Sequence, residues 1–461
     1  MNKILLFILA VTATTNAFSQ DPAVTPMISS DNNMVISQVA FSSNGKYMLV
    51  NSKAYISLIE SASSLTAASI DADGKLLCAI ALSPDGKVAA TGDTDGKITL
   101  YDIWAQKSTV KYRGHKSVIV AIAFTPDGSK VVSAATDRSV QIWSATSGKK
   151  ITSIDNFRSP ISFIAISPDG KTLATVESVS TGEVKLWDLN TGSAIRTLTF
   201  SKSKISAIAF STDGKRIATG NTLYSVEVKS TDGSGSMLQF KGHHAPILSI
   251  AFSPDGSSIA SSDISSGVIL WNSISGRVKN VLKSPQGDCY SLQFTPDNKW
   301  LLMPGYNNRI ARWNIAMTVS DWLNTFLSDR KSEIELWAMR SENENDSDYA
   351  KRVNETTRAA KNQKFIDQGK EWLMGYYRDV INWRSFELGT YNSGNGTLAL
   401  GNNLFGNFEI TIPQNKVDGF TKTLPSYHII PELVVDNNEI VPESLTIKSK
   451  TETYTATSAK Q

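Results

Sequence analysis

The sequence predicts an all-β body of seven repeated four-stranded units, a seven-bladed propeller, followed by a smaller α+β C-terminal domain. Three observations carry this prediction: a turn phrase that recurs at a nearly constant interval, strands with a two-residue period around it, and a change of composition after residue 318. Of the 461 residues, 41% are hydrophobic and 9% aromatic, which is enough to build a sizeable core.

A short phrase marks each unit, as in AISPDGK at 165–171. Its turn residue falls at Asn44, Asp85, Asp127, Asp169, Asp213, Asp255 and Asp297. Consecutive turn residues are 41, 42, 42, 44, 42 and 42 positions apart, and we number the units one to seven after them. The Asp-Gly pair predicts a hairpin, because Gly accepts a positive φ and Asp tolerates it.

Residues before each turn alternate in size with a period of two, which is the pattern of a half-buried strand. One large apolar column comprises Val39, Ile80, Ile122, Ile164, Ile208, Ile250 and Leu292. A second comprises Phe41, Leu82, Phe124, Ile166, Phe210, Phe252 and Phe294, with a small residue between the columns in every unit except at Gln293. We therefore expect a strand on each side of the turn, and a third strand further on.

The third strands carry a family resemblance. They read ITLYD at 98–102, VQIWS at 140–144, VKLWD at 184–188, VILWN at 268–272 and IARWN at 310–314. Gly-His pairs precede two units, at Gly114-His115 and Gly242-His243. Together with the turn and the period, these motifs resemble WD40 repeats over roughly residues 24–318. The resemblance implies a propeller that binds partners through loops on its two faces.

The resemblance also implies an internal hydrogen-bond network in the third unit, made by His115, Ser133, Asp137 and Trp143. Burial of these polar groups is tolerable because they satisfy one another. Other units depart from this pattern. The second retains Thr91 and Asp95 but has Tyr101 for the Trp, and the fifth has no aromatic residue near Val226–Lys229. The sixth retains His243, Ser261 and Trp271, with Ser265 where Asp is expected.

The ends of the array predict how the ring closes. The seventh unit ends near Asn314 without an outer strand, and the chain then turns helical. Residues 24–30 precede the first unit and can supply the missing strand. Such pairing removes an exposed sheet edge.

The C-terminal region has a different pattern. Residues 319–331 predict a connecting helix with Trp322, Leu323, Phe326 and Leu327 on one face. A polar break at 341–348 precedes a longer helix from Tyr349 to about Trp383, and several strands follow between 386 and 450. We expect an α+β domain over 332–451 and a flexible tail over 452–461.

The first twenty residues resemble a secretory signal peptide. A short positive start is followed by the apolar run ILLFILAV and a small, polar stretch that ends in an Ala17-Phe18-Ser19 cleavage motif ahead of Gln20. We assign 1–20 to the signal peptide and 21–318 to the propeller, and we expect an exported protein, either periplasmic or at the cell surface. We expect no membrane span, because the apolar run is far shorter than the ~20 residues that cross a bilayer.

Charge and reactive residues narrow the class of protein. The net charge is +3 with basic and acidic residues interspersed, so we do not expect a nucleic-acid binder. Cys78 and Cys289 lie in different units, and we expect two buried thiols rather than a disulfide. Among the four histidines, His428 lies alone in a strand-like stretch, and His244 is expected to be exposed.

Two further patterns have competing interpretations. Asp71-Ala-Asp73-Gly74 and Asp93-Thr-Asp95-Gly96 resemble the opening of a calcium loop, but hairpin turns explain them better because neither continues with the further ligands. The aromatic residues Trp372, Tyr376, Tyr377 and Trp383 are interpreted as core rather than as a ligand platform.

We find no catalytic motif, cofactor site or metal site in the sequence. The favoured function is therefore an exported, non-catalytic scaffold that presents loops to protein partners in the cell envelope or at the surface. The alternative is a ligand-binding or enzymatic propeller that acts on a glycan or small molecule.

Overall fold

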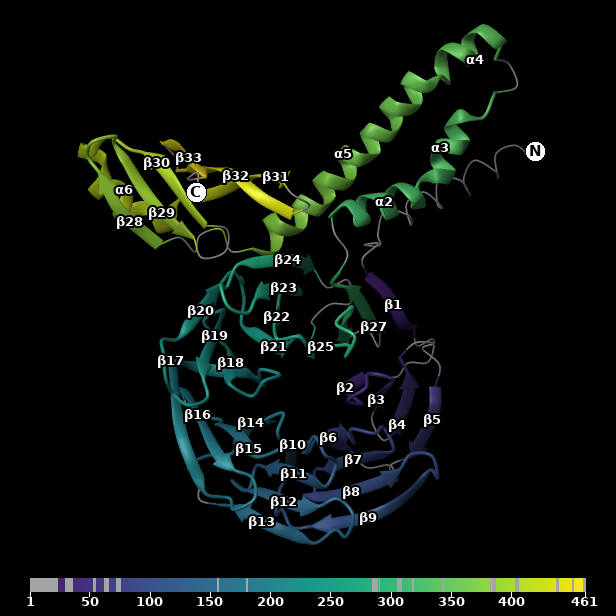
Figure 1. Ribbon diagram of the computed structural model, residues 1–461, viewed down its shortest axis with the longest axis vertical. Coiled ribbons are helices and arrows are strands. Elements are labelled where there is room, and N and C mark those ends of the chain that lie inside the picture. Colours follow the sequence, from purple (N-terminus) through teal and green to yellow (C-terminus); the bar gives the residue numbers. More distant parts are fainter. Residues whose placement is uncertain are drawn as a thin grey trace.

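The computed structural model describes residues 24–29, 36–52, 55–61, 66–71, 76–155, 157–179, 181–283, 289, 291–304, 309–316, 319–341, 344–381, 383, 387–402, 406–436, 439–449 and 452–458. Its main body is a ring of antiparallel sheets whose inner strands surround a central axis (Figure 1). This architecture is a β-propeller, and the fold is mostly β. The signal peptide expected at 1–20 lies outside the described residues.

Four units each form a separate four-stranded sheet in chain order. The first unit has β2 (Ile36–Phe41), β3 (Tyr47–Ser52), β4 (Tyr55–Glu60) and β5 (Thr66–Asp71). The second has β6 (Leu77–Leu82), β7 (Val88–Asp93), β8 (Lys97–Asp102) and β9 (Lys107–Arg113). The third has β10 (Ile119–Phe124), β11 (Lys130–Ala135), β12 (Val140–Ser144) and β13 (Lys150–Ile154). The sixth has β21 (Ile247–Phe252), β22 (Ser258–Asp263), β23 (Gly267–Asn272) and β24 (Val278–Lys283).

The fourth and fifth units share one seven-stranded sheet. Its strands are β14 (Ile161–Ile166), β15 (Thr172–Glu177), β16 (Thr181–Asp188), β17 (Ala194–Phe210), β18 (Arg216–Asn221), β19 (Ser225–Ser230) and β20 (Leu238–Lys241). The first part of β17, through Lys204, pairs with β16, and the part from Ile205 onward pairs with β18. The strand runs on because residues 194–210 contain neither Gly nor Pro.

The repeated turn phrase forms the hairpin between the first and second strands of each unit. In the third unit the Thr125 hydroxyl donates to Asp127 Oδ1 at 2.5 Å and accepts the Lys130 N–H at 3.1 Å. An equivalent hydroxyl donates to the turn residue in all seven units. Gly128 follows with a φ of 70°, and in the seventh unit Asn298 adopts a φ of 57° at this position. The Ser or Thr, the Asp and the Gly of the phrase thus all serve to form the same hairpin.

Ring closure follows the prediction from the chain ends. β25 (Gln293–Phe294), β26 (Trp300–Pro304) and β27 (Arg309–Asn314) form the seventh sheet with β1 (Val24–Ser29) as its outer strand. β1 pairs antiparallel with β27, with Val24 opposite Trp313 and Ser29 opposite Arg309. The predicted pairing of the two ends is confirmed.

The core of the ring lies between neighbouring sheets. Val131, Val132 and Ile142 of the third unit are 0% exposed. Val131 shares one buried cluster with Leu100 of the second unit. Burial of side chains of this size contributes roughly 1.5–3 kcal/mol each, so the apolar side chains of the second and third strands are a main source of the stability of the ring.

Four helices follow the ring, and two expectations about them are wrong. They are α2 (Val319–Asp329), α3 (Lys331–Ala338), α4 (Asp346–Arg352) and α5 (Glu355–Val380). The predicted polar break contains the start of α4, because the Asn345 side chain accepts the Asp348 N–H at 2.9 Å and caps that helix. The predicted longer helix is interrupted before α5, where Asn354 and Thr357 form a capping box.

α2 packs against α5 through aromatic side chains. The ring centroids of Trp322 and Trp372 lie 5.2 Å apart in a stacked arrangement. Gly369 allows this approach, because a Cβ there would lie 3.0 Å from Leu323 Cδ2. The predicted apolar face of 319–331 is therefore a helix–helix contact, although the helix itself ends at Asp329.

A six-stranded antiparallel sheet completes the chain, in the order β28-β29-β30-β33-β32-β31. Its strands are β28 (Glu387–Asn392), β29 (Thr397–Asn402), β30 (Gly406–Thr411), β31 (His428–Asp436), β32 (Glu439–Lys448) and β33 (Thr453–Ser458). The expectation of a flexible tail is wrong for 453–458, because β33 pairs with both β30 and β32 and buries Ala456 completely. The helix α6 (Val417–Thr423), which buries Phe420, was also missed.

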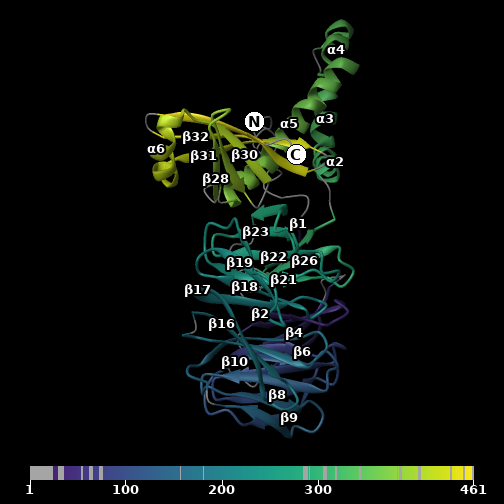
Figure 2. The ribbon, with the colours of Figure 1, turned by 60° about the vertical axis from the view of Figure 1, so that its left-hand side comes forward.

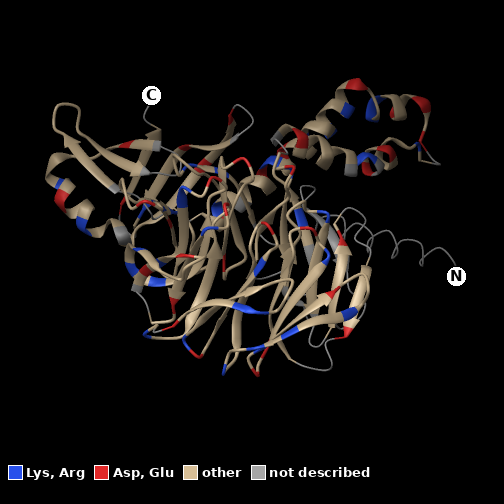
Figure 3. Ribbon diagram, turned by 60° about the horizontal axis from the view of Figure 1, so that its bottom comes forward, with Lys and Arg blue, Asp and Glu red and all other residues tan. Residues whose placement is uncertain are grey.

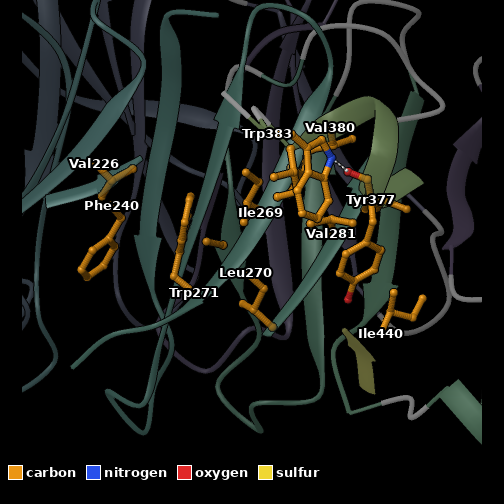
Figure 4. Close-up of a cluster of buried hydrophobic side chains, with 14 of the residues drawn as sticks. Val226, Phe240, Ile269, Leu270, Trp271, Val281, Tyr377, Val380, Trp383 and Ile440 are labelled. Atoms are coloured by element: carbon orange, nitrogen blue, oxygen red, sulfur yellow. Dashed lines mark hydrogen bonds between the residues drawn. The ribbon is translucent and has the colours of Figure 1, made fainter. Parts of the chain in front are cut away.

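The helices and the six-stranded sheet lie outside the ring, beside the sixth unit (Figures 1 and 2). The end of α5 packs on β24 and β23, and Tyr377, Val380 and Trp383 join the buried cluster of that unit (Figure 4). The Tyr377 hydroxyl donates to Asn280 Oδ1 at 3.4 Å. The interpretation of these aromatic residues as core is confirmed for Trp372, Tyr377 and Trp383.

Candidate interaction surfaces

The antiparallel order of the strands divides the loops of the ring between two faces. The Asp-Gly turns and the loops between third and fourth strands lie on one face, which we call the turn face. The loops between second and third strands, and those that lead from one unit to the next, lie on the opposite face, the loop face. On the loop face the described loops of units three to six are 114–118, 136–139, 157–160, 178–179, 222–224, 242–246 and 264–266, and residues 201–204 of β17 link the fourth unit to the fifth on the same face.

The third unit brings all four expected network residues together. Trp143 Nε1 donates to Ser133 Oγ at 3.0 Å, His115 Nε2 lies 2.8 Å from the same oxygen, and His115 Nδ1 lies 3.1 Å from Asp137 Oδ2. Burial lowers the pKa of His115 and outweighs the opposite effect of the Asp137 charge. A neutral His115 that donates from Nδ1 and accepts at Nε2 satisfies every member of the chain.

The sixth unit has an equivalent network with a different carboxylate. Trp271 Nε1 donates to Ser261 Oγ at 2.7 Å, and His243 Nε2 lies 2.6 Å from that oxygen. The expectation that this unit lacks the Asp is wrong. Asp263, two residues before Ser265, lies 2.8 Å from His243 Nδ1. The side chain that completes the network can therefore come from the end of the second strand as well as from the loop after it.

The second unit likewise has its buried carboxylate at the end of the second strand and not in the loop that follows. Asp93 is 5% exposed, and its Oδ1 accepts the N–H groups of Asp95 and Lys97 at 3.0 and 2.9 Å. Asp95, the expected network residue, is exposed. Asp93 stands at the strand position that Asp263 has in the sixth unit, and each follows the turn residue of its unit by eight positions.

The fourth and fifth units hold their loops with buried glutamates. Glu177 Oε2 accepts the Ser159 N–H at 2.9 Å, and Glu227 Oε2 accepts the Ser201 N–H at 2.9 Å. Glu227 is 1% exposed and its other oxygen accepts from Asn221 and Gln239, both at 3.0 Å. A carboxylate or an Asp–His pair thus anchors the loop face in every unit from the third to the sixth.

Backbone bonds fix the same loops at equivalent points. In four successive units, a loop N–H donates to a carbonyl in the adjacent unit-linking loop: Thr136 to Val118 at 3.0 Å, Ser178 to Pro160 at 2.8 Å, Thr222 to Lys204 at 3.0 Å, and Ile264 to Pro246 at 3.1 Å. Buried side-chain anchors and repeated backbone bonds make this face a rigid platform. The arrangement can hold a partner. Its two Ser–His–Asp sets have serines, Ser133 and Ser261, that are 0% exposed, so these groups fix the loops and are closed to a substrate.

Large apolar side chains are exposed on this platform. Val179, Leu223, Tyr224 and Ile264 are 71%, 67%, 41% and 47% exposed on the loops of three adjacent units. Tyr224 has a φ of 67° at a position where the second unit has Gly96. A left-handed conformation costs a residue other than Gly roughly 1–2 kcal/mol, so the fold by itself favours Gly there.

Exposed basic side chains also lie on the loop face. They are Lys116, Arg138, Arg158, Lys202 and Lys204, from the third to fifth units. Over the ring as a whole, basic and acidic residues are interspersed (Figure 3). The sequence analysis missed this local grouping because the residues come from different units of the chain. Comparing the loop-face positions of successive units would have revealed it.

The thiols and histidines form no cluster. Within the described ranges, no group of three or more His, Cys, Asp and Glu side chains is arranged to hold a metal ion. Neither Cys78 nor Cys289 forms a disulfide, and burial raises the pKa of Cys289 to about 12. The expectation of two buried thiols is wrong for Cys78, which is half-buried on the inner strand β6.

Asp73, which belongs to the first of the two sequence patterns that resemble a calcium loop, lies outside the described residues. His428 is exposed on β31.

No helix in the described part of the chain is both long and apolar enough to cross a membrane.

These sheets, turns and buried Trp–Ser–His–Asp networks define a β-propeller of WD type. Comparison with family models agrees. Residues 192–228 and 235–272 match the WD domain, G-beta repeat, and residues 46–184 match the Nucleolar protein 10-like N-terminal domain, a β-propeller. No curated protein matches the chain. The chain belongs to the WD40-repeat β-propeller family. This family indicates a protein-interaction scaffold, and its propellers are usually non-catalytic.

Proposed function

We propose that this chain is an exported, non-catalytic scaffold whose loop face binds a protein partner in the cell envelope or at the cell surface. The observation that carries the proposal is the set of exposed apolar side chains on a rigid platform: Val179, Leu223, Tyr224 and Ile264. Exposed large apolar side chains gathered on one face of a protein are typical of protein-binding sites. Aromatic side chains such as Tyr224 commonly dominate the binding energy there.

The charge of the loop face indicates the chemistry of the partner. Five exposed cations lie on this face of the third to fifth units, so we expect a partner surface that carries acidic as well as apolar residues. Because the apolar side chains lie on loops that are already fixed, little conformational entropy is lost when the partner binds.

The proposed architecture has seven blades, with β17 divided between the fourth and fifth and β1 completing the seventh. The helices and the six-stranded sheet form an α+β C-terminal domain in this proposal. Their attachment to β24 leaves the loop face of the third to fifth units open, so the domain can orient the propeller or offer a second docking surface.

Export rests on residues 1–20 and is tested separately. In the native host, the mass of the purified protein should correspond to cleavage ahead of Gln20, and the protein should fractionate with the periplasm or the cell surface. An intact N-terminus with a cytoplasmic location would contradict this part of the proposal.

The partner is tested by crosslinking in intact cells, purification through a C-terminal tag and mass spectrometry. The chain carrying Val179→Ser and Leu223→Ser should lose a stoichiometric partner at least about tenfold, because each exposed side chain contributes on the order of 1 kcal/mol or more at a well-packed interface. The matched control is Ile274→Ser, which removes a side chain that is 73% exposed on the turn face. Equal recovery of the partner with both variants would reject the loop face as the binding site.

Tyr224→Gly sharpens the test without a folding penalty. It relieves a positive φ while it removes the aromatic ring, so we expect an unfolding temperature within about 2 °C of the parent and weaker partner recovery. Ser266→Gly, at the equivalent position of the sixth unit, has the same backbone effect and should leave recovery unchanged.

A further inference from the structure

An arginine occupies an apolar position where the ring closes. In each unit one third-strand residue packs between sheets: Leu58, Leu100, Ile142, Leu186, Val228 and Leu270, all at most 4% exposed. In the seventh unit the equivalent residue is Arg312, which pairs with Leu302 as Leu270 pairs with Ala260. The guanidinium carbon of Arg312 lies 4.6 Å from the centroid of the Trp300 ring.

Arg312 borders a cavity between the seventh and first units. The cavity has a volume of about 280 Å³ and is lined by Asn44–Lys46, Ser61, Thr295–Asp297, Trp300, Leu302 and Arg312. The cavity therefore lies between the turn of the first unit and the seventh sheet. The same sheet contains the pairing of β1 with β27 that closes the ring.

Two buried polar atoms of this cavity lack a partner. Arg312 Nε and Ser61 Oγ are inaccessible and make no hydrogen bond among the described residues. A guanidinium Nε–H is a donor only, and a serine hydroxyl can also donate, so the missing partner is an acceptor. Unsatisfied buried polar groups are rare in native proteins because each costs roughly 1–3 kcal/mol.

Other parts of the ring have one of these features without the other. Arg216 lies 5.6 Å from the Phe252 ring, but its guanidinium donates to the Ser273 carbonyl at 2.8 Å. A cavity of about 430 Å³ at the equivalent junction of the second and third units is lined by Asp85 and Asp127 and by no basic residue. The closing junction differs from both places, because its cavity is bordered by an arginine whose Nε has no hydrogen-bond partner.

We propose that the cavity at the closing junction binds a carboxylate group, which Arg312 and Ser61 recognise while Trp300 covers the guanidinium. A planar guanidinium matches the geometry of a carboxylate. Asp297 lines the same cavity, with its Oδ1 accepting from Thr295 and from the Lys299 N–H, so a single negative charge fits better than a phosphate dianion. The carboxylate belongs either to a small free acid or to an acidic side chain of a peptide.

The test is titration calorimetry of the full mature chain with succinate, with the peptide acetyl-Gly-Glu-Gly-amide and with inorganic phosphate. We expect saturable 1:1 binding of a carboxylate probe. Arg312→Leu restores the side chain typical of the other units, so it should fold, and it should weaken binding at least about tenfold because it removes the charged donor. Arg216→Leu is the matched control and should leave the affinity unchanged.

Each outcome decides the proposal. Tighter binding of succinate assigns the site to a free acid, and tighter binding of the peptide assigns it to a protein side chain. If neither carboxylate saturates, or if Arg312→Leu binds as well as the parent, water fills the cavity and the proposal is wrong. Stronger binding of phosphate would overturn the choice of carboxylate. Should Arg312→Leu fail to fold, Ser61→Ala keeps the charge and should still weaken binding severalfold, because it removes one hydrogen-bond donor.

Discussion

The sixth and seventh sheets of the ring occupy equivalent places but are held in different ways. In the sixth, four strands consecutive in the chain surround Trp271, whose indole N–H bonds to Ser261 within the His243–Asp263 network. In the seventh, three strands near the end of the propeller pair with β1 from its beginning. Met303 stands where the sixth sheet has Ser261, and Arg312 stands where it has Leu270.

The difference shows where repetition stops. A sheet made by one unit can keep a full polar network, because every member lies within about 30 residues of the others. The closing sheet instead joins the two ends of the array, β1 and β27. It therefore relies on backbone pairing and apolar contact, and it leaves a cavity at its junction with the first unit.

The largest expected effect is the loss of closure. Deletion of residues 21–32 from the mature chain removes β1 and exposes the edge of β27. We expect the unfolding temperature to fall by roughly 10 °C or more, since each kcal/mol corresponds to about 2–4 °C in a domain of this size. Calorimetry checks this against the mature chain that begins at Gln20. An unchanged transition would show that β1 does not close the ring.

The junction of the turns should be the next most sensitive place. Gly45 has a φ of 65°, and a Cβ there would clash with the ring of Pro296 from the seventh unit. Gly45→Ala should cost about 3 kcal/mol, from positive-φ strain and from the clash. Gly214→Ala has the same backbone strain, but its Cβ would lie 3.6 Å from Pro168, so it should cost only about 1–2 kcal/mol. Equal losses in urea unfolding would contradict a tight closing contact.

The two tryptophans compare the polar networks directly. Trp271→Phe and Trp313→Phe remove the same atoms from buried sites, but only Trp271 donates to a serine in the same sheet. We expect Trp271→Phe to be more destabilising by about 1 kcal/mol, the net value of one hydrogen bond. If denaturant midpoints shift equally, the network contributes nothing beyond packing.

The smallest expected effect concerns acid. The Thr125 hydroxyl and the Ser129 N–H lower the pKa of Asp127 to about 2. Because the folded pKa is below the unfolded one, this turn stabilises the fold fully above about pH 4 and loses its effect as the pH falls toward 2. Asp127→Asn should remove that dependence and cost a few tenths of a kcal/mol at pH 7, since the group is exposed.

The first unit offers the reverse change, because it already has Asn44 in this place. Asn44→Asp should add a small stabilisation that is present at pH 7 and absent near pH 2. Melting curves at the two pH values measure both variants. A stabilisation by Asn44→Asp that persists at pH 2 would exclude ionisation as its cause.

Much of the ring could be predicted because each unit repeats the short-range sequence patterns that form its turn and its strands. The hydroxyl, Asp and Gly of the turn phrase lie within four residues of one another, and the apolar columns have the two-residue period of a strand. The pairing of β1 with β27 was also predictable, since an array with one strand missing at one end had a spare strand at the other. The C-terminal helices were placed less well, because two asparagine caps decide their boundaries and hydrophobic periodicity does not reveal caps.

The sequence by itself determined the fold of the ring, since it states the same turn and strand pattern seven times, and it determined which residues form the network of the third unit. Only the tertiary structure decided that Asp263 replaces the missing partner of His243, and that β33 lies inside a sheet rather than in a flexible tail. It also decided that Arg312 faces a cavity with Ser61. The physical reason is the separation of the interacting residues along the chain. Turns and strand periods depend on residues that are close in sequence, whereas these contacts join groups that become neighbours only when sheets pack.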